Sequence, residues 1–276
     1  NISFADYIAC GPNHSACIMK YDKNMENSYK IFTWGSSFSG KLGHLNPDDI
    51  CEPTEIDSID VESVYFVQIE LGNEFSIALD IKGKLWGWGR KKYLGFYNDN
   101  DLKNEILKTP KRLSSDLTYS YISASDVGIM AIDIDGNAFI FGGIFDKGNL
   151  TYVKLSESKS LNNDEKMEFG KIGLTHSISI DNTYNCPYSW GNNLYFKCGQ
   201  KFYTDVSGIE TEIIYSNTPK RIDYFLENVF DEKAKDKINS QTVQVKKTSS
   251  KHYIQGILFN KIKDMKDDNV ILEDIK

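Results

Sequence analysis

The chain has 276 residues, of which 40% are hydrophobic and 13% aromatic, and its net charge at pH 7 is −7. This length suits one large all-β domain or two smaller ones, and the apolar fraction is large enough for a hydrophobic core. The acidic balance disfavours broad contact with DNA or RNA, because nucleic-acid-binding domains normally carry a basic excess.

Five cysteines without a Cys-x-x-Cys pair indicate a reduced, intracellular protein rather than a disulfide framework or a structural zinc site. No apolar run approaches the roughly 18–20 residues that span a bilayer, so we expect no membrane insertion. The chain begins at Asn1 rather than Met, and we therefore expect its natural N-terminus to be missing. The cytoplasm, the nucleus and the organelles all stay open as compartments.

The first repeat unit is predicted at about residues 5–50. A short apolar strand leads to the turn motif Gly11-Pro12-Asn13-His14-Ser15, and a later strand ends in the pair Trp34-Gly35. Phe32 lies two positions before this tryptophan. Since residues i and i+2 of a strand point to the same face, the two rings are expected on one face of a sheet.

The second unit, at about residues 51–108, repeats this order. The turn motif reads Gly72-Asn73-Glu74-Phe75-Ser76, and the hairpin turn Asp80-Ile81-Lys82-Gly83 follows. Glycine in such a hairpin accepts the positive φ that tight turns need. The aromatic strand carries Trp86 and ends in Trp88-Gly89.

The third unit, at about residues 109–155, has a degenerate turn motif at 125–129. Its aromatic strand carries Phe139 and ends in Phe141-Gly142. The hairpin turn before that strand ends in Gly136, as the second unit predicts.

The fourth unit is predicted at about residues 165–217. The turn motif Gly173-Leu174-Thr175-His176-Ser177 returns, and the aromatic strand carries Tyr188 and ends in Trp190-Gly191. After most of these aromatic–glycine pairs the chain reaches a Leu-Gly-type element and then a proline-led strand, which we interpret as the opening of the next unit.

A fifth unit is predicted at about residues 218–262, opening with Thr218-Pro219-Lys220-Arg221-Ile222. Strands fit near 243–245 and 253–259, without a closing aromatic–glycine pair. Residues 263–276 form an acidic and polar C-terminal tail.

The aromatic–glycine pairs recur 54, 53 and 49 residues apart. A period near fifty residues is typical of propellers and solenoids. We therefore predict a single, all-β, propeller-type repeat domain over residues 1–276.

The order of motifs resembles the regulator of chromosome condensation repeat family, with a proline-led strand, Gly-x-x-His-Ser, Gly-x-aromatic-x-Trp-Gly and Leu-Gly. The resemblance covers about residues 5–260 and is strongest up to about residue 200. It implies a β-propeller of seven four-stranded antiparallel blades. Seven blades at this period need about 350 residues, whereas about five units are visible. The chain is then a fragment, a divergent full-length module or an open propeller that a partner completes. The first two are favoured, because an open ring would expose strand edges.

The repeated residues have structural roles in this interpretation. His14 and His176 are expected to hydrogen-bond buried backbone groups within their blades, and the aromatic pairs are expected in the core. The structural repeat positions are Gly11, His14, Trp34, Gly35, Gly72, Trp86, Trp88, Gly89, Phe141, Gly142, Gly173, His176, Trp190 and Gly191.

A group of basic residues is the best candidate for binding a partner. It consists of Arg90, Lys91 and Lys92, where the chain should leave the sheet, and of Lys108, Lys111 and Arg112 one connection later. A solvated loop is one interpretation of these charges. The other is salt-dependent contact with an acidic partner surface or a nucleic-acid phosphate.

No residues converge as nucleophile, base and orienting group, so we assign no catalytic residue, no cofactor and no metal ligand. The favoured function is a non-catalytic scaffold that binds a protein partner through loops at a propeller face. The alternative, which the resemblance implies, is guanine-nucleotide exchange on a Ran-type small GTPase with chromatin association. Because the chain is acidic, chromatin or nucleic-acid contact is not expected to dominate.

Overall fold

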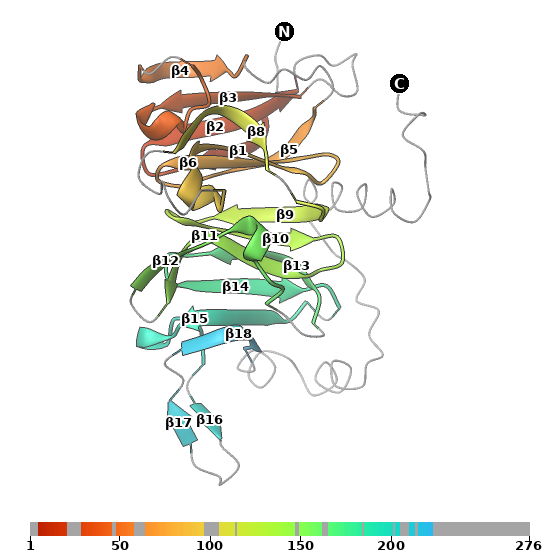
Figure 1. The fold of residues 1–276 in the computed structure, drawn as a ribbon. Coiled ribbons are helices and arrows are strands. Elements are labelled where there is room, and N and C mark those ends of the chain that lie inside the picture. The colour runs from red at the N-terminus through yellow and green to blue at the C-terminus, as the bar shows by residue number, and fades with distance from the viewer. Residues whose placement is uncertain are drawn as a thin grey trace, which may run out of the picture.

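The structure is a computed structural model. It describes residues 5–20, 29–45, 48–57, 64–96, 105–113, 115–146, 149–161, 165–183, 185–200, 202–204, 210–212 and 215–222. Within these ranges the fold is all-β, and none of its short 3-10 helices has the length and apolarity needed to cross a membrane. The strands form four antiparallel sheets of four strands each, stacked one after another (Figure 1). The predicted all-β architecture of four-stranded antiparallel blades is confirmed.

Each sheet is a blade, and the blades follow chain order. Blade 1 consists of β1 (Ala5–Cys10), β2 (His14–Lys20), β3 (Tyr29–Gly35) and β4 (Ile50–Glu55). Blade 2 consists of β5 (Phe66–Leu71), β6 (Phe75–Asp80), β7 (Leu85–Arg90) and β8 (Ile106–Arg112). Blade 3 consists of β9 (Tyr119–Ala124), β10 (Gly128–Asp133), β11 (Ala138–Asp146) and β12 (Asn149–Val153). Blade 4 consists of β13 (Met167–Ile172), β14 (His176–Asp181), β15 (Pro187–Asn192) and β18 (Tyr215–Arg221).

Four 3-10 helices and one further hairpin complete the described elements. The 3-10 helices are η1 (Phe38–Gly40), η2 (Lys91–Leu94), η3 (Leu155–Glu157) and η4 (Leu194–Phe196). The hairpin pairs β16 (Phe202–Thr204) with β17 (Glu210–Glu212). Helices η1, η2 and η4 each follow an aromatic–glycine pair, so the same turn position recurs in blades 1, 2 and 4.

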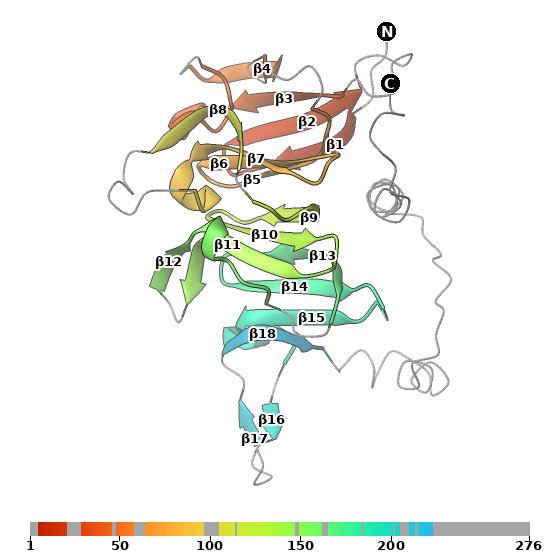
Figure 2. The same cartoon turned by 45° about the vertical axis from the view of Figure 1, so that its right-hand side comes forward.

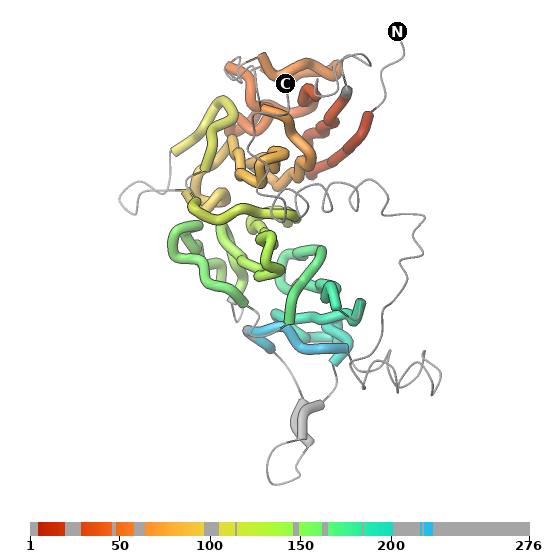
Figure 3. Tube along the Cα trace, turned by 90° about the vertical axis from the view of Figure 1, so that its right-hand side faces the viewer, coloured from red at the N-terminus to blue at the C-terminus, as the bar shows by residue number. Residues whose placement is uncertain are grey.

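The four sheets do not close into a ring. Blades 1 and 4 lie at opposite ends of the stack (Figure 2), and the blades between them follow in chain order (Figure 3). Among the described residues, the first strand of each later blade packs on the first two strands of the blade before it, as β5 packs on β1 and β2. The 3-10 turns add further contacts, as η1 does with β7 and β8. The described chain is therefore a partial propeller.

The predicted unit boundaries are out of phase with the blades. The strands that contain Pro53, Pro110 and Pro219 were expected to open new units at 51, 109 and 218, but each pairs with the preceding sheet as its fourth strand. Each is an edge strand, where the missing N–H of proline leaves no ladder bond unmade. Residues 218–222 therefore end blade 4, and the remainder of the predicted fifth unit and tail lies outside the described residues.

Backbone geometry explains why glycine follows the aromatic ring in every unit. Gly35, Gly89, Gly142 and Gly191 all have positive φ, between 81° and 108°. A Cβ at Gly89 would lie 2.4 Å from the carbonyl oxygen of Glu74, and one at Gly191 would lie 2.6 Å from that of Thr175. Both the dihedral angle and the close approach of the neighbouring backbone exclude larger residues.

The aromatic strands supply much of the core, as expected. Trp88, Phe141 and Trp190 are buried between consecutive blades, whereas Trp34 in the first blade is only half-buried. Of the rings two positions earlier, Phe139 and Tyr188 are buried, but Phe32 and Trp86 are only half-buried, so the expectation that every aromatic pair lies in the core is met in part. One apolar cluster runs through blades 1 to 3, and a second joins blades 3 and 4 around Tyr121, Met167 and Tyr188.

Candidate protein-interaction surface

Arg90, the first of the predicted basic residues, is held between two blades. Its Nε donates to Glu74 Oε2 at 2.5 Å, and its Nη2 donates to Ser39 Oγ, on η1 of blade 1, at 3.1 Å. Ser39 Oγ in turn donates to the same Glu74 oxygen at 2.7 Å. Burial alone would raise the pKa of Glu74, but the hydrogen bonds from Ser39 and Arg90, together with the charges of Arg90 and Lys92, outweigh it and lower that pKa. Arg90 thus joins blade 2 to blade 1.

Lys91 and Lys92 are also engaged within the chain. Lys91 Nζ lies 3.4 Å from Glu105 Oε2. Lys92 Nζ lies 4.8 Å from the ring centroid of Tyr93 and 5.0 Å from that of Tyr152, which belongs to blade 3. A cation over aromatic faces at these distances is attracted by the ring quadrupoles. Arg90, Lys91 and Lys92 therefore all make contacts within the chain, and those of Arg90 and Lys92 link blade 2 to blades 1 and 3.

The other three predicted residues have a different environment. Lys108, Lys111 and Arg112 lie on β8, the outer strand of blade 2, and their side chains are exposed. None of them forms an ion pair with a residue that the structure describes. We call these three residues the basic rim. The structure thus separates the six predicted cations into two groups of three.

Sequence reasoning did not single out a second basic edge, on blade 4. Lys220 and Arg221 follow the buried Pro219 on β18 and are exposed, as Lys111 and Arg112 are after Pro110. The repeated Thr-Pro-Lys-Arg, at 109–112 and 218–221, is the sequence signal that marks both edges.

The side chain of His14 contacts another side chain rather than the backbone. The buried His14 places Nε2 3.0 Å from Ser76 Oγ on blade 2, rather than within its own blade as predicted. Burial, followed by the charge of the Lys41 ammonium, lowers the pKa of His14 to about 3. His176, the equivalent residue of blade 4, is only half-buried.

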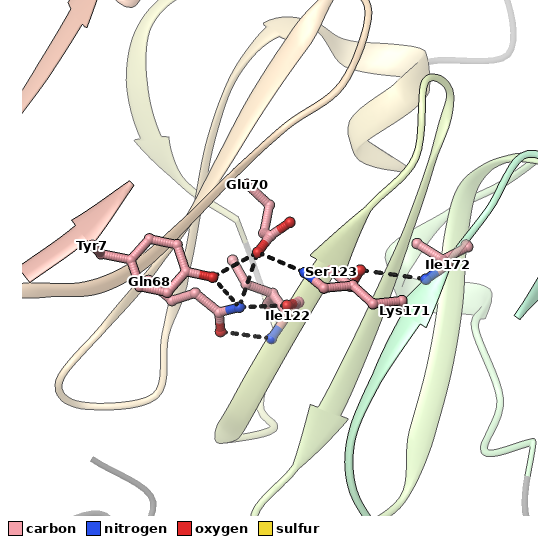
Figure 4. A network of polar contacts seen from close by, with 7 residues as sticks. All are labelled: Tyr7, Gln68, Glu70, Ile122, Ser123, Lys171 and Ile172. Carbon is pink, nitrogen blue, oxygen red and sulfur yellow. Dashed lines mark hydrogen bonds and ion pairs between the residues drawn. The ribbon is translucent and has the colours of Figure 1, made fainter. Parts of the chain in front are cut away.

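A polar network crosses the first strands of the blades (Figure 4). Gln68 on β5 forms two hydrogen bonds with the backbone of Ile122 on β9: its Nε2 donates to the carbonyl at 2.6 Å, and its Oε1 accepts from the N–H at 3.0 Å. The hydroxyl of Tyr7, on β1, donates to Glu70 Oε1 at 2.7 Å. Burial, followed by the charge of Glu70, raises the pKa of Tyr7.

The network continues to blade 4. Lys171 Nζ, on β13, lies 3.4 Å from Glu70 Oε1, and the N–H of Ile172 donates to Ser123 Oγ at 3.3 Å. In this network, polar side chains pair with one another or with the backbone of the next blade. The hydrogen bonds and the ion pair link the first strands of the four blades, β1, β5, β9 and β13. In the part of the chain that the structure describes, no group of three or more potential metal ligands occurs.

Comparison with known proteins identifies related repeats. A family model described as the regulator of chromosome condensation (RCC1) repeat matches residues 30–79. The chain is 22% identical over 196 residues to the ultraviolet-B receptor UVR8 of Arabidopsis thaliana, covering 70% of this chain and 42% of that protein. It is 24% identical over 197 residues to a human RCC1-like G exchanging factor-like protein, covering 68% of this chain and 40% of that protein.

A solved structure shows the same fold. The crystal structure of Prp20p from Saccharomyces cerevisiae, described with its binding to Gsp1p and histones, matches with a TM-score of 0.55 and 20% identity over 80% of this chain and 51% of that chain. The chain thus spans about half or less of the length of each of these relatives. The resemblance to this repeat family, read from the motifs, is confirmed.

Proposed function

We propose that this chain, built from repeats of the RCC1 type, is a non-catalytic scaffold that binds a protein partner through the basic rim. The observation that carries the proposal is the exposure of Lys108, Lys111 and Arg112 without an ion pair to any described residue. The net charge of the chain is −7, but the basic rim carries three positive charges. A locally positive surface of this kind attracts acidic surfaces.

The chemistry of the rim indicates how a partner binds. Lysine on an edge strand, together with Pro110, discourages backbone pairing with another strand. The contact is therefore made by side chains, and the partner presents an acidic segment rather than a free strand edge. All five cysteines are unpaired, which supports a reducing intracellular compartment for this interaction.

Binding of a fluorescein-labelled, glutamate-rich peptide, followed by anisotropy, tests the proposal. The double variant Lys108→Glu with Lys111→Glu is expected to weaken binding at least about tenfold at low salt, because two attractive charges become repulsive. Raising the ionic strength should weaken binding by the wild type. The matched control is Lys82→Glu with Lys159→Glu, two exposed lysines elsewhere with the same change of charge. Equal loss in both double variants would exclude a specific role for the rim.

Guanine-nucleotide exchange on a Ran-type small GTPase is the second candidate. It is favoured by the similarity to the human G exchanging factor-like protein and to Prp20p, whose structure is described with binding to Gsp1p and histones. Release of fluorescent GDP from such a GTPase, in excess GTP, is the assay. Release at the intrinsic rate removes this candidate and leaves the rim proposal standing, whereas nucleosome binding that weakens steeply with salt supports the chromatin role.

A further inference from the structure

The two Thr-Pro-Lys-Arg segments are the only places in the sequence where a proline follows a serine or threonine. The chain has six prolines, and only Pro110 and Pro219 are preceded by such a residue, Thr109 and Thr218. In each segment an arginine lies three positions after the threonine. Proline-directed protein kinases select their substrates by these two features, a proline next to the acceptor residue and a basic residue two positions beyond that proline.

Thr109 lies in a β-bulge of the outer strand of blade 2. Gly87 pairs with Lys111 and Gly89 pairs with Leu107, so the single residue between the two glycines of β7 faces three residues of β8. Thr109 is the middle one of these three and has no paired residue on β7. A bulge leaves its extra residues outside the regular ladder. The Thr109 side chain is half-buried, and its hydroxyl forms no hydrogen bond with a residue that the structure describes.

Thr218 occupies the same position in blade 4. Ser189 pairs with Lys220 and Gly191 pairs with Ser216, which again sets three residues of β18 against one residue of β15. The Thr218 side chain is exposed, and its hydroxyl makes no hydrogen bond within the described part of the chain. Both β8 and β18 are edge strands of their sheets, so each threonine lies at a boundary that no other described strand pairs with.

Blade 1 shows that this bulge accepts a negative charge. Thr33 pairs with Thr54 and Gly35 pairs with Ile50, so residues 51–53 form the equivalent bulge, and its middle residue is Glu52. The Glu52 side chain is exposed. A carboxylate at the position of the two threonines is therefore compatible with a four-stranded sheet, and we expect a phosphate group there to be compatible with it as well.

We propose that Thr109 and Thr218 are phosphorylation sites for a proline-directed protein kinase. In the reaction, the threonine Oγ1 attacks the γ-phosphorus of ATP, and the bond between that phosphorus and the leaving ADP breaks. The hydroxyl proton passes to the catalytic aspartate of the kinase. The products are one phosphothreonine and one ADP for each site.

A kinase gains access when the edge strand opens locally. Pro110 and Pro219 are buried, so the kinase binds each segment after the strand has separated from its sheet. Exposed edge strands open at a small fraction of the free energy of global unfolding, and the unpaired residues of the bulge reduce that cost further. Proline also keeps the preceding threonine extended, which is the conformation in which kinases bind their substrates.

Phosphorylation of Thr109 changes the charge of the basic rim. A phosphate adds a charge of about −2 at pH 7, between Lys108 and Lys111, so the three positive charges of the rim fall to about one. This change weakens the attraction for an acidic partner. The consequence for binding rests on the proposed function of the rim, whereas the modification itself does not. Thr218 lies on blade 4, and its phosphorylation leaves the charge of the rim unchanged.

Phosphate incorporation into the complete, folded 276-residue chain tests the proposal. The protein is incubated with ATP, Mg²⁺ and a cyclin-dependent kinase, and the modified residues are mapped by mass spectrometry. Thr109→Val and Thr218→Val are each expected to remove one of two sites, and the double variant both. Thr54→Val is the matched control and should leave incorporation unchanged, because Thr54 is exposed on the equivalent strand β4 but is not followed by proline.

The variant Pro219→Ala tests the kind of kinase. It keeps the hydroxyl and both basic residues, and it should lower incorporation at Thr218 at least about tenfold while Thr109 is modified as before. Equal modification without the proline would show that a kinase directed by basic residues alone acts here. Incorporation only after denaturation, or only at other residues, would also overturn the proposal.

Binding of the glutamate-rich peptide measures the consequence separately. Thr109→Glu is expected to weaken binding about fivefold, whereas Thr218→Glu should not change it. Equal loss in both variants would contradict the effect of charge at the rim. If the unmodified chain does not bind the peptide, the function of the rim is excluded but the mapped phosphorylation sites are unaffected. If no phosphate is incorporated, the sites are excluded and peptide binding by the unmodified chain is unaffected.

Discussion

His14 and Phe75 occupy the same turn position in blades 1 and 2, yet only the histidine can titrate. Unfolded, His14 has a pKa near 6.5, whereas burial lowers the folded value to about 3. The unfolded chain therefore binds more protons between these two pH values. The stability that the neutral ring provides is present above pH 6.5 and is lost as the pH falls towards 3.

The variant His14→Phe, which places the blade 2 residue in blade 1, should reduce this dependence. Between pH 7 and pH 5 the wild type is expected to lose about 2 kcal/mol more of its unfolding free energy than the variant does. Urea unfolding at the two pH values, followed by tryptophan fluorescence, measures the difference. Parallel losses in both proteins would show that His14 is not the titrating group.

Recurring residues could be predicted from the sequence, but not their contacts. Three adjacent cations at 90–92 suggested an exposed patch. The carboxylate of Glu74 and the hydroxyl of Ser39, which engage Arg90, meet it only when two blades pack together. The exposure of the basic rim could be predicted from the sequence, because these residues lie on an edge strand, where their side chains need no packing partner.

At the level of the elements, the aromatic–glycine pair has two roles. The aromatic ring contributes to the core, and the glycine adopts a backbone conformation that other residues rarely adopt. In blade 2 the residue after Trp88 has a φ of 98°, and the backbone of the neighbouring strand leaves no space for a Cβ. The spacing of these pairs could be read from the sequence because glycine at a positive φ tolerates no substitute.

Gly89→Ala is accordingly expected to lower the unfolding free energy by about 3 kcal/mol, from the strained dihedral angle and the displaced backbone together. Denaturant unfolding provides the measurement. Lys82→Ala, at an exposed position in the preceding hairpin turn, serves as the control and should change stability by less than about 0.5 kcal/mol. A comparable effect of the two substitutions would contradict the geometric explanation.

The phase of the blades could not be predicted in the same way. A strand led by Pro53 fits the start of a new sheet and the edge of an old one equally well. Only the pairing of Phe32 with Glu55 assigns it to blade 1. In a periodic sequence, the period can be read directly, whereas the starting point depends on contacts between distant residues.

For the whole molecule, burial is concentrated in the second strands of the middle blades. All six residues of β6 and all six of β10 are buried, whereas most of β4 and β12 is exposed. Local stability should follow this gradient, since exposed edge strands open without disturbing the core.

Hydrogen exchange with mass spectrometry should therefore show amides of β6 and β10 protected at least about a hundredfold longer than those of β4 and β12. Exchange of the same peptides under denaturing conditions corrects for intrinsic rates. Uniform protection across the four strands would mean that the stack opens only as one unit.

The offset between repeat and blade also bears on how such a chain grows by gene duplication. The matched repeat, residues 30–79, contains the last two strands of blade 1 and the first two of blade 2. A copied segment with these bounds cannot fold alone, because it donates half of one sheet and half of the next. A newly duplicated segment therefore forms sheets with the segments on both sides of it. Recombination between repeats then still yields complete four-stranded sheets, with no strand left unpaired.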